Sequence, residues 1–164
     1  MQFQRVWAMP NRWTFTIKPI KELLIVEMSG VLWIDPFAGK NSPADYTNDI
    51  DKTCPTNYHK DALEFLKETK GLYAGALYDP PYSLTQARMY GKKEYANMLY
   101  WKQCKDELAR LIMPGGKAIC FGWNSNGLGK CRGFELERVL LVAHGGSKND
   151  TIVTVERKGN SSHD

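Results

Sequence analysis

One short segment, Asp79-Pro80-Pro81-Tyr82, combines residue types that could hold an amino group beside an aromatic ring. It follows an apolar run at residues 74–78 that predicts a buried strand, and ligands of open α/β sheets bind beyond the carboxyl ends of strands. The prolines have no backbone N–H groups, which leaves carbonyl oxygens here free to accept hydrogen bonds from a ligand. A carboxylate and a carbonyl together suit an exocyclic amino group, and the tyrosine ring could stack on a base.

The elements that must position this segment alternate between helix and strand. Apolar residues at helical spacing predict helices at about 18–28, 59–67 and 94–113, the last of them broken by Pro114-Gly115-Gly116. Short apolar segments predict strands at 31–34, 45–47, 74–78, 117–121, 136–143 and 151–157. The first seventeen residues are too irregular to predict a strand. This alternation indicates an α/β fold with a mainly parallel sheet and helices on both faces.

The turn after the first predicted strand has chemistry of its own. It reads Asp35-Pro36-Phe37-Ala38-Gly39, and the glycine permits a tight turn that can approach a ligand closely. In nucleotide-binding α/β folds an acidic residue after a later strand accepts hydrogen bonds from ribose hydroxyls. In this chain Asp49 fits that place best by register, with Asp51 as the alternative.

The order of these segments resembles that of the S-adenosylmethionine-dependent methyltransferases that act on amino groups. Asp79-Pro80-Pro81-Tyr82 resembles their DPPY motif, residues 35–39 resemble their DPFxG loop, and residues 18–24 resemble the KP-containing segment before that loop. The resemblance implies the Rossmann-like class I methyltransferase fold, whose sheet ends in an antiparallel hairpin strand. The Gly145-Gly146 turn between the last two predicted strands agrees with such a hairpin.

The same resemblance implies the organisation of the chain and the reaction. It covers nearly the whole sequence and implies a single methyltransferase domain at 1–158, without a separate target recognition domain and with a loose polar tail at 159–164. S-adenosylmethionine would be the methyl donor and S-adenosylhomocysteine the product, with no metal required. The small adenine-N6 DNA methyltransferases of phages and prophages are the most similar group, which implies methylation of the adenine N6 amino group in DNA.

The site residues follow from matching positions to these motifs. The catalytic residues would be Asp79, Pro80, Pro81 and Tyr82. The cofactor-binding residues would be Thr14, Phe15, Ile17, Asp35, Pro36, Phe37, Ala38, Gly39, Asp49, Asp61 and Ala62. Asp61 has an alternative interpretation as an ordinary residue at a helix start. The family usually has a second glycine two positions after the first, where this chain has Asn41; asparagine tolerates left-handed backbone better than most residues.

Contacts to nucleic acid are expected on two connections. The candidates are Arg88, Lys92 and Lys93 after the DPPY segment, and Trp123, Lys130 and Arg132 on the Gly-rich loop after residue 121. Basic residues would mainly touch phosphates, which predicts low or short sequence specificity, in a monomer or in a homodimer that pools two surfaces. Trp123 has the alternative interpretation of a tryptophan that caps the core.

Several alternatives remain open at this point. An RNA adenine-N6 methyltransferase would use the same pocket, and a catalytically inactive relative would keep the fold. Cytosine-N4 enzymes more often carry serine at the position of Asp79, and protein-glutamine methyltransferases usually carry asparagine there.

Composition sets broad limits. The 164 residues favour one compact domain, and 43% hydrophobic residues can form a core. A net charge of +4 permits a polyanionic partner without requiring one. No apolar stretch is long enough to span a bilayer and no signal-peptide pattern opens the chain, so a cytoplasmic protein without a membrane partner is expected. The four cysteines and three histidines are scattered, which disfavours disulfides and a zinc site.

Overall fold

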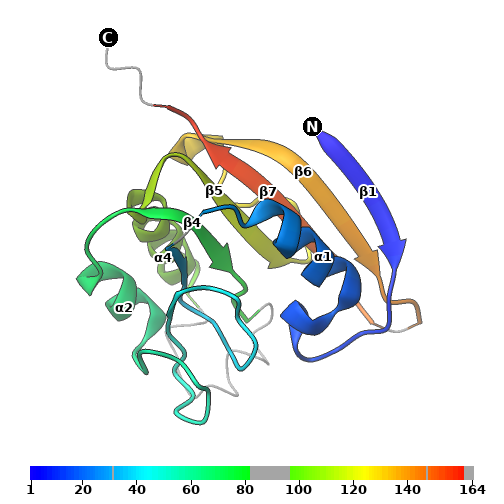
Figure 1. Ribbon diagram of the computed structural model, residues 1–164, viewed down its shortest axis with the longest axis horizontal. Coiled ribbons are helices and arrows are strands. Elements are labelled where there is room, and N and C mark those ends of the chain that lie inside the picture. The colour runs from blue at the N-terminus through cyan, green and yellow to red at the C-terminus, as the bar shows by residue number, and fades with distance from the viewer. Residues whose placement is uncertain (31, 82–96, 147, 161–164) are drawn as a thin grey trace.

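A seven-stranded sheet forms the centre of the molecule (Figure 1). The computed structural model describes residues 1–30, 32–81, 97–146 and 148–160. The strand order is β1-β6-β7-β5-β4-β2-β3. In chain order the strands are β1 (Gln2–Trp7), β2 (Trp33–Asp35), β3 (Tyr46–Thr47), β4 (Tyr73–Tyr78), β5 (Ile112–Gly122), β6 (Phe134–Ala143) and β7 (Thr151–Lys158). Strand β7 is antiparallel to both β5 and β6, and every other pair is parallel, which confirms the predicted topology.

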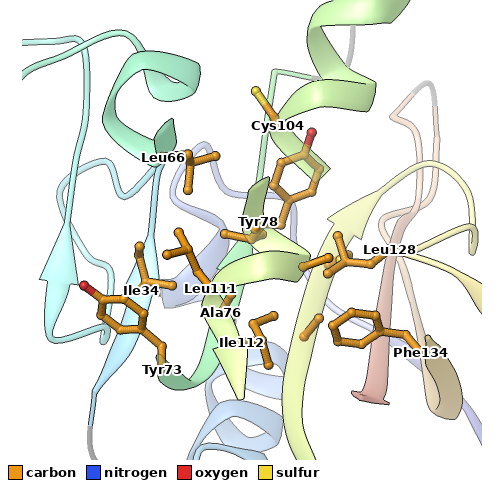
Figure 2. Packing of buried hydrophobic residues seen from close by; sticks show 14 of the residues in the cluster. Ile34, Leu66, Tyr73, Ala76, Tyr78, Cys104, Leu111, Ile112, Leu128 and Phe134 are labelled. Carbon is orange, nitrogen blue, oxygen red and sulfur yellow. The ribbon is translucent and has the colours of Figure 1, made fainter. Parts of the chain in front are cut away.

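Helices cover both faces of this sheet. The helices are α1 (Lys18–Glu27), α2 (Ala62–Glu68) and α4 (Met98–Leu111), with 3₁₀ turns η1 (Thr14–Thr16) and η3 (Lys130–Arg132). Helix α1 and η1 pack on one face, where Ile20 and Leu23 meet sheet residues such as Leu140. Helices α2 and α4 pack on the other face over the core shown in Figure 2, in which Cys104 of α4 lies above Tyr78 of β4. None of the helices among the described residues has the length and apolarity needed to cross a membrane.

Local sequence explains the helix boundaries. Helix α1 has Pro19 in its first turn, where a missing N–H costs no hydrogen bond, and it buries Ile20, Leu23 and Leu24 on one side. Helix α4 begins after Asn97, whose side-chain oxygen accepts a hydrogen bond from the Leu99 backbone N–H at 2.9 Å. Both helices therefore lie close to the predicted positions.

Two predictions about the strands were wrong. The irregular first segment contains β1, which pairs with β6 at the edge of the sheet (Figure 1). Every residue of β1 except the half-buried Val6 is exposed, so the strand carries no alternating burial pattern for sequence analysis to find. The segment Pro114-Gly115-Gly116 does not follow a helix that ends at Met113. Helix α4 already ends at Leu111, and these residues form the start of β5.

A break in strand register explains the second error. Between β4 and β5 the register shifts in the stretch from Tyr73 to Gly75, so the residues of β5 between Ile112 and Lys117 form an irregularity in the ladder. Gly115 has a φ of 75°, and a Cβ at Gly116 would lie 2.8 Å from the Ala74 carbonyl oxygen. Two glycines are therefore needed at a strand irregularity rather than at a helix end.

Gly75 of β4 is required for close packing against Trp33. A Cβ at this position would lie 2.5 Å from two atoms of the Trp33 ring, which is almost fully buried. We expect Gly75→Ala to lower the free energy of unfolding by about 1–3 kcal/mol, because overpacking forces the buried ring to move. Urea unfolding measures this change. Gly159→Ala is the matched control, since its nearest neighbour would be 3.6 Å away; equal midpoints for the two variants would contradict the assignment.

Candidate active site

The carboxyl ends of β2, β4 and β5 meet at one edge of the sheet. Strand β4 is parallel to both neighbours, with Ala76 opposite Ile34 of β2 and Tyr78 opposite Cys120 of β5. The turns that follow these strands therefore lie side by side at the same edge. They contain the DPFAG loop (residues 35–39), the Asp79-Pro80-Pro81 segment and the loop that begins at Trp123.

Asp35 shapes the DPFAG loop from within. Its side chain is fully buried, and its carboxylate accepts hydrogen bonds from the Phe37 backbone N–H at 2.9 Å and from the Ser42 hydroxyl at 2.6 Å. Burial raises the pKa of Asp35 to about 7 against the opposing effect of these hydrogen bonds, and the nearby charges of Asp79 and Asp49 raise it further. Three carboxylates thus share this edge of the sheet.

The loop turns at Gly39, as predicted. Gly39 has a φ of 58°, and its N–H donates a hydrogen bond to the Asp49 carboxylate at 2.8 Å. Among the described residues Leu32 is the only non-glycine with a positive φ, so Asn41 does not adopt left-handed backbone. The loop therefore closes without the conformation that a second glycine, or a left-handed asparagine, would supply.

Asp49 and Asp51 have different surroundings. The Asp49 carboxylate contacts Gly39 through one oxygen and accepts from the Asp51 N–H at 2.9 Å through the other. The exposed Asp51 instead accepts from the Thr53 N–H at 2.9 Å, and this hydrogen bond lowers its pKa. Asp49, the residue favoured by register, is thus the one that touches the DPFAG loop.

Asn48 is a positioning residue that sequence analysis missed. It is completely buried, and its side-chain amide donates to the carbonyl oxygens of Pro36 at 3.2 Å and Lys60 at 3.0 Å. Its side-chain oxygen accepts from the Lys60 N–H at 2.9 Å. Asn48 therefore joins the DPFAG loop to the segment that leads into α2. A polar residue directly after a short buried strand was the available signal.

Asp61 is the N-cap of α2, in agreement with its alternative interpretation as a residue at a helix start. Its carboxylate accepts from the N–H groups of Leu63 at 3.1 Å and Glu64 at 3.2 Å, and the Tyr100 hydroxyl donates to it at 3.0 Å. Ala62 is buried as the first residue of the helix. These contacts give Asp61 a structural role, and its contact with a cofactor stays a prediction.

The three N-terminal candidates divide between site and core. The Thr14 side chain forms a hydrogen bond with Asp79, which lowers the pKa of that carboxyl. Phe15 and Ile17 are buried, and Phe15 meets Phe121 edge to face with ring centroids 5.4 Å apart. The side chains of Phe15 and Ile17 therefore belong to the hydrophobic core that packs against α1, whereas the Thr14 side chain contacts Asp79 of the DPPY segment.

Asp79 lies between the DPFAG loop and a pocket beside α4. The residue is half-buried, and burial raises the pKa of Asp79 to about 7 despite the hydrogen bond from Thr14. Its charge in turn raises the pKa of Asp35. Pro80 and Pro81, by contrast, line a pocket on the side of α4. The segment therefore faces the DPFAG loop with its carboxylate and the pocket with its prolines. Tyr82 lies outside the described residues.

This pocket has a volume of about 260 Å³. It is closed by the ends of β4 and β5, by α4 and by the Gly-rich loop, and it is lined by Tyr78, Pro80, Pro81, Trp101, Lys105, Cys120, Phe121, Gly122, Trp123, Asn124 and Gly127. Trp123 is 45% exposed and lies in the wall with the two prolines, so it does not cap the core. The lining is mostly aromatic and apolar, which suits a flat ring.

Buried Glu156 holds the loop that closes the pocket. Its carboxylate accepts from the N–H groups of Leu128 at 2.6 Å and Gly129 at 2.9 Å. The Lys105 ammonium donates to the Gly127 carbonyl oxygen at 2.6 Å from the other side. A Cβ at Gly127 would lie 2.1 Å from Glu156, so the loop packs directly on this carboxylate. Sequence analysis missed Glu156 because its partners lie 27 and 28 residues away.

The predicted nucleic-acid contacts are only partly described. Arg88, Lys92 and Lys93 lie outside the described residues. Lys130 is exposed on η3, while Arg132 pairs with Asp106 at 2.7 Å and donates to the Leu128 carbonyl oxygen at 2.7 Å. Arg132 therefore has structural partners, and Lys130 is the more accessible cation of this loop.

No protein-family model matches this sequence, and comparison with curated proteins finds no similar sequence. Solved structures are similar in fold. TrmN from Thermus thermophilus has a TM-score of 0.60 at 18% identity over 87% of this chain and 49% of its own, so this chain spans about half of it. N-methyltransferase NodS from Bradyrhizobium japonicum, in complex with S-adenosylhomocysteine, has a TM-score of 0.57 at 13% identity over 86% of each chain.

A third similar structure is the 1,6-didemethyltoxoflavin-N1-methyltransferase of Burkholderia thailandensis, with bound 1,6-didemethyltoxoflavin and S-adenosylhomocysteine. Its TM-score is 0.61 at 12% identity, over 87% of this chain and 78% of its own. Identities this low establish the fold alone. The chain thus has the Rossmann-like fold of class I methyltransferases, as the resemblance implied.

Proposed function

We propose that this chain transfers a methyl group from S-adenosylmethionine to the exocyclic N6 amino group of adenine in DNA. One observation carries the proposal. The Asp79-Pro80-Pro81 segment joins a cluster of carboxylates beside the DPFAG loop to an aromatic pocket of about 260 Å³. That volume is close to the lower end for small-molecule sites, roughly 300 Å³, and suits a single base. The similar folds of methyltransferases solved with S-adenosylhomocysteine support the choice of methyl donor.

The carboxylate cluster fits a cationic ligand. Asp35 and Asp79 each have a pKa of about 7 because burial disfavours their charged forms, and the charge of Asp79 raises the pKa of Asp35 further. A positive group between them would relieve both effects. S-adenosylmethionine carries a sulfonium cation and supplies an activated methyl group when bound. Asp49 and Gly39 would face its ribose and methionine portions, following the resemblance of the DPFAG loop.

The hydrogen-bond acceptors of the DPPY segment would make the amino nitrogen of the substrate a better nucleophile. The lone pair of an adenine amino nitrogen is delocalised into the ring, which makes the nitrogen a poor nucleophile. Asp79 would accept one amino hydrogen through its carboxylate and Pro80 the other through its carbonyl oxygen, so that the lone pair localises toward the methyl group. Tyr82 would hold the base in plane. Orientation of this kind can contribute ~7–11 kcal/mol.

A base in duplex DNA must leave the stack to reach this pocket, at a cost of a few kcal/mol. Trp101 and Trp123 in the pocket wall offer aromatic contacts to an extruded base. The exposed Lys130 lies on the same loop as Trp123 and would contact a phosphate. We further propose low sequence specificity, because a phosphate contact positions DNA without reading its sequence.

Binding of the methyl donor should depend on pH. Because Asp35 and Asp79 have pKa values of about 7 in the free protein, they lose their protons as the pH rises through neutrality. If one ionised carboxylate is required, we expect S-adenosylmethionine to bind about 10-fold more tightly near pH 8 than near pH 6. Calorimetry measures both affinities. S-adenosylhomocysteine has a neutral sulfur and is the control; identical pH profiles for the two ligands would exclude a role for these charges.

The function is tested with tritium-labelled S-adenosylmethionine and a panel of duplex DNA, single-stranded DNA and RNA, followed by identification of the labelled base. We expect label in N6-methyladenine of DNA. Label in RNA alone would replace DNA by RNA as the substrate. Binding of S-adenosylhomocysteine without label in any nucleic acid would refute methyl transfer and leave a cofactor-binding relative.

A further inference from the structure

Lys105 is the source of formal charge in the aromatic pocket. Among the eleven described lining residues there is no aspartate, glutamate, arginine or histidine, and Lys105 is the single lysine. Tyr78 and Cys120 also line the pocket, but burial raises the pKa of both, to about 12 for Cys120. Both groups are therefore neutral at physiological pH, and the described lining carries one positive charge.

The ammonium group of Lys105 is held in a defined place. It donates to the Gly127 carbonyl oxygen at 2.6 Å and lies 5.9 Å from the centre of the Tyr78 ring. Cys104 and Leu108, which flank it on α4, are completely buried and fix the helix against the sheet (Figure 2 shows Cys104). An ammonium group has three donors, and the Gly127 carbonyl accepts from one of them. Donors therefore remain for a ligand in the pocket.

A nearby carboxylate does not cancel this charge by direct pairing. Glu156 lies behind the pocket wall, where its oxygens accept from the N–H groups of Leu128 and Gly129. The backbone of Gly127 separates it from Lys105, as the carbonyl contact on one side and the close packing on the other show. The Lys105 charge would repel a cationic amine that enters the pocket. A neutral aromatic amine that bears an acceptor could instead accept a hydrogen bond from the Lys105 ammonium group.

We propose that Lys105 determines which substrate the pocket accepts, by donating a hydrogen bond to an acceptor atom of a bound nucleotide. The acceptor is a ring nitrogen of the base or an oxygen of its phosphate. This inference rests on the proposed function insofar as it takes the pocket for the substrate site. It adds the residue that recognises the substrate: Lys105 favours a neutral aromatic amine with an adjacent acceptor over a basic amine.

The test measures binding without methyl transfer. The intact protein with saturating S-adenosylhomocysteine is titrated with deoxyadenosine and with deoxyadenosine monophosphate, followed by calorimetry. We expect Lys105→Met to weaken binding by about 10-fold or more, the usual effect of losing a hydrogen bond from a charged group. A loss with both ligands identifies the base edge as acceptor, and a loss confined to the monophosphate identifies the phosphate.

Two further variants separate this role from a general effect on folding. Lys102→Met removes a lysine from the same helix that is 67% exposed and lies outside the pocket, and it should change neither affinity by more than about 2-fold. Glu156→Gln loosens the Gly127–Gly129 loop while it keeps the Lys105 charge. We expect a smaller loss from Glu156→Gln than from Lys105→Met. Lys105→Arg should restore part of the affinity.

Three outcomes would overturn the inference. They are equal binding by Lys105→Met and the wild type, a loss in Glu156→Gln as large as that in Lys105→Met, or binding of neither ligand by the wild type. A different result would show that the proposed function, and not the role of Lys105, is wrong. In that case the wild type would bind the nucleotide through Lys105 and still transfer no methyl group to DNA or RNA.

Discussion

Asp79→Asn should abolish methyl transfer while it stabilises the free protein at alkaline pH. Asparagine keeps the size of the side chain but loses the negative charge and presents donor hydrogens to an amino group that needs acceptors. We expect the rate of transfer to fall by ~10³-fold or more, an effect of the size seen when a preorganised electrostatic contact to a reacting group is lost. Affinity for S-adenosylhomocysteine should change little, because that ligand has no sulfonium charge.

The effect of Asp79→Asn on stability has a defined pH dependence. The folded-state pKa of about 7 lies above the ordinary value of 3.8, so between these values the folded protein keeps a proton that the unfolded chain has lost. Stability of the wild type therefore falls as the pH rises from about 4 to about 7. Asparagine stays neutral, so its advantage should be absent near pH 4 and reach roughly 2–4 kcal/mol above pH 7. Thermal unfolding across pH measures this difference.

The control for both effects is Glu135→Gln, which removes an exposed carboxylate on β6. It should leave methyl transfer and the pH dependence of unfolding unchanged. An active Asp79→Asn variant would refute the role of Asp79 in transfer. A variant that is inactive but no more stable at alkaline pH than the wild type would instead refute the burial of its charge.

Asn48→Ala should cost both stability and cofactor binding. The substitution leaves the buried Pro36 carbonyl and the part-buried Lys60 carbonyl and Lys60 N–H without their partner. Each unsatisfied buried group costs about 1–3 kcal/mol, and we expect a total loss of ~3–5 kcal/mol after partial relaxation. Because Asn48 holds the DPFAG loop against the lead into α2, affinity for S-adenosylhomocysteine should fall at least ~10-fold at temperatures where the variant is folded.

Asn41→Ala is the matched control, since Asn41 is an exposed asparagine that follows the same loop. Its unfolding midpoint and its affinity for S-adenosylhomocysteine should stay close to those of the wild type. If Asn48→Ala bound S-adenosylhomocysteine as tightly as Asn41→Ala, the loop would not depend on this side chain.

Apolar periodicity and turn residues were sufficient to predict most strands of the sheet and the approximate positions of the helices. The apolar run before Asp79 became β4, and the turn at Gly145-Gly146 joined an antiparallel pair. Strand β1 could not be predicted because its residues are exposed on both faces, so that pairing with β6 holds it rather than a burial pattern. The glycines after Pro114 serve a strand irregularity, which depends on the partner strand and not on local propensity.

The candidate site shows the same division. Asp35, Gly39 and Asp79 could be placed from motif and strand register, because Asp35 ends β2, Gly39 turns the chain after β2 and Asp79 directly follows β4. Asn48, Glu156 and Lys105 act through partners 12 to 28 residues away, and no local pattern encodes such contacts. Asp61 was correctly placed at a helix start, where its capping contacts with Leu63 and Glu64 are local.

The most direct test of the central claim is to express the chain in a host that lacks DNA methylation and to map modified bases across the genome. We predict N6-methyladenine in cells that produce the wild type, and none in cells that produce Asp79→Asn at an equal level. A genome without modified adenine, or one in which Asp79→Asn leaves the modification unchanged, would contradict the assignment of this pocket to adenine methylation.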